Sequence, residues 1–162
     1  MDDTDESLAE NEPALAFTAE ELKTGLLRAA KQNDVEQAEK LLEVETIDVN
    51  QSDSRGFTPL IWASAVGAKQ IVGLLLRRNA DIQAVTNNGD TALHWACYKG
   101  HAEVVTLLLA AGADIQRPGE GGATPLHCAV SGEHAEIVKL LLMRGVDTTC
   151  KNMYVLSTTC TE

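Results

Sequence analysis

The chain has 162 residues, of which 44% are hydrophobic and only 4% aromatic, so its core must consist mainly of leucine, isoleucine, valine and alanine, a composition that favours helices. A formal net charge of −11 repels phosphate backbones and anionic lipids and therefore argues against nucleic acid or membranes as partners. The amino terminus lacks a secretory signal pattern and the four cysteines form no CxxC motif, so we expect a cytoplasmic or nuclear protein with reduced thiols.

The amino-terminal part is acidic. Its first 22 residues carry eight acidic side chains and no basic one. Residues 1–17 have little apolar surface to bury, so we predict a disordered acidic tail there. The next segment, 18–57, is predicted to be an N-terminal capping unit: Thr18 can cap a helix, Glu21 can complete the capping box, and Phe17 can contact Leu22.

The rest of the chain repeats at a constant interval. A Thr-Pro-Leu or Thr-Ala-Leu triplet begins at Thr58, Thr91 and Thr124, and a triple leucine recurs at 74–76, 107–109 and 140–142. The spacing from Thr58 to Thr91, called the repeat interval below, is the same in every case, and a weaker copy of the pattern precedes them. We therefore predict units at 58–90, 91–123 and 124–156, and a C-terminal tail at 157–162.

Each unit is predicted to contain two helices. The threonine of each triplet can cap the first helix, with Pro59 or Pro125 in the first helical position, where proline loses no hydrogen bond. The second helix, for example Ala102–Ala111, would end at Gly112, and Gly145 and Asn79 hold the same place because these residue types accept the left-handed conformation. Three consecutive leucines cannot all face one side of a helix, so the units must stack into a solenoid.

The sequence GDTALHWACYKGHAEVVTLLLAAGADIQ, residues 89–116, resembles the ankyrin repeat, and the resemblance covers about residues 25–156. It implies an all-α solenoid of stacked helix-turn-helix units with projecting β-turn fingers. It also implies structural roles for the threonine of the triplet and for the histidine that follows it, which forms a hydrogen-bonding strut between units. The matching residues are Thr58, Thr91, His94, Thr124 and His127, and Ile61 replaces the histidine in the second unit.

One short stretch contains residue types typical of metal or nucleophilic sites: His94, Trp95, Cys97 and His101. The repeat favours a structural interpretation, because His127 and His134 lie one repeat interval beyond His94 and His101 and are displaced by a whole unit along the stack. Cys97 and Cys128 are expected to be small core residues. We therefore expect no catalytic residue, no metal and no cofactor.

The resemblance implies protein–protein recognition through the finger tips and the concave face of the first helices. Carried over by position, the candidate contact residues are Arg55, Phe57, Val66, Arg78, Asn88, Asp90, Tyr98, Lys99, Ser131 and Arg144. Four of them are basic, so we expect a protein partner with an acidic or mixed-charge surface, and a chain that is monomeric by itself. Trp62 and Trp95 lie near this face and fit either the core or the contact surface, as aromatic residues often do.

Three functions fit these features. The first is a non-catalytic adaptor or scaffold that binds a partner segment. The second is a regulatory or assembly subunit of a larger enzyme complex, such as a phosphatase, a ubiquitin ligase or a proteasome. The third is a fragment of a longer ankyrin scaffold, because the next turn glycine would fall at Val155 and we expect no further helix pair after it. The alternatives are that this end folds back over the last unit or that it is simply frayed.

Overall fold

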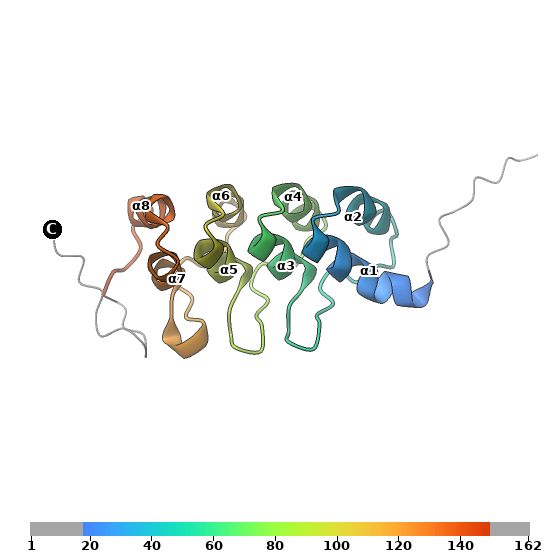
Figure 1. Cartoon of the computed structure of the whole chain (residues 1–162), viewed down its shortest axis with the longest axis horizontal. Coiled ribbons are helices and arrows are strands. Elements are labelled where there is room, and N and C mark those ends of the chain that lie inside the picture. Colours follow the sequence, from blue (N-terminus) through green and yellow to red (C-terminus); the bar gives the residue numbers. More distant parts are fainter. Residues whose placement is uncertain (1–17, 150–162) are drawn as a thin grey trace, which may run out of the picture.

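The computed structural model describes residues 18–149, which contain eight α-helices arranged as four successive pairs. The pairs, called units one to four below, are α1 (Ala19–Gln32) with α2 (Val35–Leu42), α3 (Pro59–Val66) with α4 (Lys69–Arg77), α5 (Ala92–Lys99) with α6 (Ala102–Ala110), and α7 (Pro125–Ser131) with α8 (Ala135–Met143). Figure 1 shows the first helices in one row and the second helices in another, with loops projecting beyond the first row. The predicted all-α solenoid is confirmed.

The helix starts follow from local chemistry. Thr18 and Glu21 form the predicted capping box, in which the Thr18 N–H donates to Glu21 Oε2 at 2.8 Å and the Glu21 N–H donates to Thr18 Oγ1 at 3.2 Å. Thr58 caps α3 by accepting the Ile61 N–H at 3.3 Å. Phe17 lies outside the described residues, so its contact with Leu22 stays a prediction.

The helix ends also follow the prediction. Gly112 and Gly145 have φ values of 92° and 75°, and Asn79 has a φ of 57° at the same repeat position. All three are therefore in the left-handed region that glycine and asparagine tolerate best. The carbonyl groups of the last helical turn can then be hydrogen-bonded as the chain turns toward the next unit.

The core runs the length of the stack and consists of aliphatic side chains, with Phe57 as its one buried aromatic residue among those described. The middle leucine of each triplet, Leu75, Leu108 and Leu141, is completely buried. Its neighbours in the triplet, such as Leu74 and Leu76, are only partly buried against the core. The first helices make the most extensive contacts from unit to unit, α1 with α3, α3 with α5 and α5 with α7. No helix within residues 18–149 is long and apolar enough to cross a membrane.

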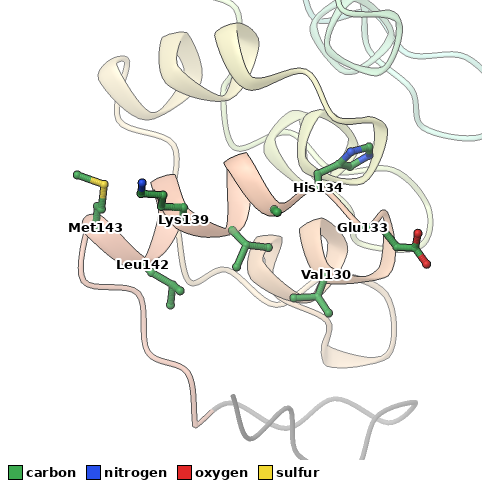
Figure 2. A pocket seen from close by; sticks show the side chains of 8 residues that line it. Val130, Glu133, His134, Lys139, Leu142 and Met143 are labelled. Carbon is green, nitrogen blue, oxygen red and sulfur yellow. The ribbon is translucent and has the colours of Figure 1, made fainter. Parts of the chain in front are cut away.

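The face of unit four that points away from unit three contains an open apolar depression of about 670 Å³ (Figure 2). Val130 and Val138 line it. Their equivalents one unit earlier, Cys97 and Val105, are completely buried, so the same face of unit three is covered by the next unit. The apolar character of the depression is therefore a property of the stacking surface.

Truncation of a central leucine tests this packing. We expect Leu108→Ala to lower the free energy of unfolding by about 2–5 kcal/mol, because it leaves a cavity between the two helices and between units. Leu142→Ala is the control, since Leu142 is 40% exposed, and we expect it to cost less than half as much. Urea unfolding followed by circular dichroism measures both, and equal losses would contradict the core described here.

Candidate functional site

The fingers are the loops 53–57, 86–90 and 119–123. A main-chain hydrogen bond closes each one, from Asp53 N–H to Phe57 O at 3.0 Å, from Thr86 N–H to Asp90 O at 2.9 Å, and from Gly119 N–H to Ala123 O at 2.7 Å. Neighbouring fingers are also joined. The Asn87 N–H donates to the Arg55 carbonyl at 3.0 Å, and the Glu120 N–H donates to Asp90 Oδ1 at 3.0 Å. The fingers therefore form a continuous ladder with fixed spacing.

Gly119 is required for the approach of the last two fingers. A side-chain carbon added there would collide with the Asp90 carboxylate and would lie 3.0 Å from the His94 ring. The absence of a side chain lets both groups pack directly against the third finger.

His94, the predicted strut between units, contacts both its own helix start and the next finger. The Thr91 N–H donates to His94 Nδ1 at 3.1 Å, so Nδ1 is the acceptor and the ring proton is on Nε2. Nε2–H then donates to the carbonyl of Ala123 at 3.1 Å, in the finger of the next unit. Burial is the main cause that lowers the pKa of His94, which favours the neutral ring that this arrangement needs.

His127 repeats the first half of this arrangement, since its Nδ1 accepts the Thr124 N–H at 3.1 Å. The position equivalent to Ala123 in the following unit is 156, which lies outside the described residues. The strut role of His127 between units therefore stays a prediction.

His101 and His134 form a second set of links between units, which the sequence analysis did not identify. Nε2 of His101 lies 3.2 Å from the Ala65 carbonyl, and Nε2 of His134 lies 3.0 Å from the Tyr98 carbonyl. Each ring therefore satisfies a carbonyl near the end of the first helix in the preceding unit. The signal was their separation by one repeat interval, which indicated a structural role without indicating the partner.

Nucleophilic and metal chemistry have little support from the described groups. Burial raises the pKa of the Cys97 thiol strongly, and it raises that of Cys128 to about 12, so both remain protonated and unreactive at neutral pH. Within residues 18–149, no three histidine, cysteine or acidic side chains are close enough to hold a metal ion. The histidines instead bond to main-chain groups.

Four aromatic residues form a continuous series, called the aromatic row, along the first helices and fingers: Phe57, Trp62, Trp95 and Tyr98. The ring centroids of Phe57 lie 4.7 Å from Trp62 and 5.1 Å from Trp95, and Trp95 lies 6.3 Å from Tyr98. Phe57 is only 7% exposed and Tyr98 is 45% exposed. Phe57 is therefore a buried ring that packs against both tryptophans, whereas the exposed ring of Tyr98 is available for contact with a partner.

In unit two, the indole of Trp62 is hydrogen-bonded to the finger that precedes its helix. The indole N–H of Trp62 donates to Asp53 Oδ2 at 3.1 Å, while the N–H groups of Arg55 and Phe57 donate to Oδ1 at 2.9 and 3.0 Å. Burial acts to raise the pKa of Asp53, but these hydrogen bonds and the nearby Arg55 lower it overall. Asp53 is thus an ionised acceptor at neutral pH.

Unit three lacks this acceptor. Thr86 occupies the position of Asp53 one repeat interval later, and it accepts the Asp90 N–H at 3.3 Å. The indole nitrogen of Trp95 is buried and has no acceptor among residues 18–149. Leaving a buried donor unsatisfied costs about 1–3 kcal/mol of folding free energy. The missing acceptor in unit three therefore lowers the stability of the isolated chain.

A pocket of about 490 Å³, called the finger groove, lies between the last two fingers and the first helices α5 and α7. Its lining residues are Asn88, Asp90, His94, Trp95, Tyr98, Glu120, Ala123, His127, Cys128 and Ser131. Asp90 and Glu120 supply two carboxylates. Three ion pairs are present within residues 18–149, and neither carboxylate belongs to any of them.

Four of the contact residues predicted from the sequence converge here: Asn88, Asp90, Tyr98 and Ser131. The other candidates are placed elsewhere. Phe57 belongs to the aromatic row in the preceding finger, Arg55 lies over its ring, and Lys99 lies over the ring of Tyr98 at 5.1 Å. Val66 ends α3, where it is 38% exposed. Arg78 and Arg144 are the C-caps of α4 and α8, in the row of second helices, so the structure does not bring them to the groove.

Comparison with known proteins agrees with this architecture. A family model for ankyrin repeats matches residues 7–86, 26–118 and 80–152. The human DNA-binding protein RFXANK is 43% identical over 68 residues, which make up 42% of this chain and 25% of that protein. The similarity thus spans a quarter of the relative's length.

The lowered pKa of His94 predicts how the free energy of unfolding changes with pH. Because its pKa is lowered in the folded chain, the unfolded chain binds the extra proton as pH falls below the unfolded value of about 6.5. The stability that neutral His94 contributes is therefore present above that pH and lost below it. We expect His94→Ile, which copies Ile61 of unit two, to unfold with about 1–3 kcal/mol less stability at pH 7.5, and with a shallower loss between pH 7.5 and 5.5.

Urea unfolding at several pH values in this interval measures both chains, and carboxyl groups titrate mostly below it. Parallel curves for the two proteins would show that His94 does not titrate with unfolding.

Proposed function

The chain belongs to the ankyrin-repeat family, whose members serve as protein-interaction modules, and from this premise we propose that it is a non-catalytic adaptor or scaffold that binds another protein through the finger groove. The observation that carries the proposal is the convergence of Asn88, Asp90, Tyr98 and Ser131 on one pocket. These four were selected by repeat position alone, and they come from two fingers and two first helices.

The groove has the composition of a recognition surface. Tyr98 is 45% exposed and rests edge-on against Trp95, at 89° between the ring planes. Tyrosine and tryptophan are common among residues that contribute most to binding, because each buries a large rigid surface at low entropic cost. Asn88 and Ser131 are exposed and provide polar groups at the rim.

A binding function accounts for the groups that would otherwise suggest catalysis. His94 and His127 are buried, and each accepts the N–H of the threonine three residues before it. The Cys128 thiol in the groove is protonated at neutral pH. A general base or nucleophile needs a titratable group available to substrate near its working pH, and the groove supports a contact role for its residues instead.

We propose a protein partner with a mixed-charge surface, because the groove contains Asp90 and Glu120 while Arg55 and Lys99 lie along the same face. The net charge of −11 argues against direct contact with nucleic acid. DNA binding is stated in the name of the human relative only. A regulatory or assembly subunit of a larger complex remains the second proposal, with the same groove as its contact surface in the cytoplasm or the nucleus.

Paired variants test the groove. We expect Tyr98→Ala combined with Asn88→Ala to reduce affinity for the captured partner by at least about thirty-fold, the equivalent of about 2 kcal/mol for one dominant contact residue. Gln70→Ala with Thr106→Ala is the control, since both side chains are exposed on the second helices α4 and α6. Quantitative capture from cell extract, followed by calorimetry with the purified partner, gives both values. Equal affinity of the two variants would refute binding at the groove.

A further inference from the structure

Unit two contains its own cation, placed against aromatic rings and a carboxylate. The guanidinium of Arg55 lies 4.8 Å from the ring centroid of Phe57 and 5.0 Å from that of Trp62. One of its nitrogens is 3.8 Å from Asp53 Oδ2. An indole face on α3 therefore meets a carboxylate and a guanidinium of the finger that precedes this helix.

The finger groove has the indole of unit three and two carboxylates, but no cationic side chain lines it. A shift by one repeat interval replaces Arg55 by Asn88 and Phe57 by Asp90, while Trp62 becomes Trp95. Asp90, Glu120 and Trp95 all line the finger groove. Asp90 Oδ1 accepts the Glu120 N–H at 3.0 Å, which leaves Oδ2 as the oxygen that can bind an incoming donor.

Two basic side chains, Lys99 and Arg117, lie near groove residues without lining the groove. Lys99 lies over the ring of Tyr98, 5.1 Å from its centroid. Arg117 is close enough to His94 to contribute to lowering its pKa, but it makes no ion pair within residues 18–149. Neither side chain is among those that line the groove.

We propose that the finger groove binds an arginine side chain carried by an extended segment of the partner, an inference that rests on the protein-binding function above. The guanidinium stacks on Trp95 and donates hydrogen bonds to Asp90 Oδ2 and the Glu120 carboxylate, as Arg55 stacks on Trp62 beside Asp53. Arginine fits because its planar, permanently charged group can stack on an aromatic face and bond to carboxylates at once. The volume of about 490 Å³ is within the usual range for ligand sites.

The probe for this proposal is Nα-acetyl-arginine amide, titrated into the full chain. The two tryptophans give two indole N–H signals in a proton–nitrogen correlation spectrum, and Trp62→Phe assigns them. We expect a saturable shift of the Trp95 signal at millimolar concentration and a smaller shift of the Trp62 signal. Nα-acetyl-citrulline amide has nearly the same shape without the charge, and we expect at least ten-fold weaker binding.

Two matched double variants distinguish the effect of the groove carboxylates on arginine binding from the effect of the net charge of the chain. Asp90→Asn with Glu120→Gln removes both groove carboxylates while keeping an acceptor oxygen for the Glu120 N–H, and we expect at least a ten-fold loss of arginine amide binding. Glu103→Gln with Glu136→Gln removes the same net charge from the exposed second helices and should leave binding within two-fold of the parent chain.

Three results would overturn the proposal: equal binding of citrulline and arginine amides, arginine binding retained in the groove variant, or an equal Trp95 shift with Nα-acetyl-glutamate amide. Any of these, with partner capture still lost in the Tyr98 and Asn88 variant, would reject the arginine site and leave the protein-binding function standing. Loss of arginine amide binding in both double variants would also reject it, because the effect would then follow net charge.

Discussion

A pair of helices as short as those in this chain cannot bury its own apolar surface, and this constraint determines the rest of the molecule. Helices of two to three turns are marginal in water without tertiary packing. In this chain the middle leucines Leu75, Leu108 and Leu141 are completely buried, and the first helices make the most extensive contacts from unit to unit. Stability therefore depends on register: the first helices of adjacent units must meet at the same positions in every unit, and this requires a constant repeat interval.

Stacking also buries polar groups where units two, three and four meet, and histidine side chains form hydrogen bonds with them. His94 joins the cap of its own helix to the carbonyl of Ala123 in the next finger. His101 and His134 satisfy carbonyls at the ends of the preceding first helices. Buried polar groups are stabilising only when they are fully paired, so each link holds adjacent units at one distance and angle. The groove between fingers thus has a fixed width because the same contacts that hold the stack also space the fingers.

The features that the sequence predicted correctly are those set by local chemistry. Helix starts at Thr18 and Thr58, and left-handed ends at Gly112 and Asn79, follow from groups within a few residues of one another. Only some of the groove residues were among the contact residues expected from the sequence, because the lining of the groove depends on distances between units. Arg55 was expected to face a partner, and its side chain is 59% exposed. Its contacts with Phe57, Trp62 and Asp53 were not predicted. Arg78 and Arg144 directly precede Asn79 and Gly145, the expected ends of the second helices, and the structure places both there, away from the groove. Only the aligned comparison of Asp53 with Thr86 could have indicated that Trp95 loses its acceptor.

That comparison explains how one scaffold acquires different surfaces. Thr86 replaces Asp53, Asn88 replaces Arg55 and Asp90 replaces Phe57, yet the second finger closes with the same main-chain hydrogen bond, 2.9 Å against 3.0 Å in the first. Phe57 belongs to the buried core whereas Asp90 lines the groove, so the finger keeps its main-chain geometry even where a core side chain is replaced by a groove side chain. Unit two pairs its indole, carboxylate and guanidinium internally, whereas unit three has an indole N–H without an acceptor and carboxylates without a cation within the described residues. The carboxylates of Asp90 and Glu120, which belong to no ion pair within residues 18–149, therefore remain available to another molecule at the finger groove.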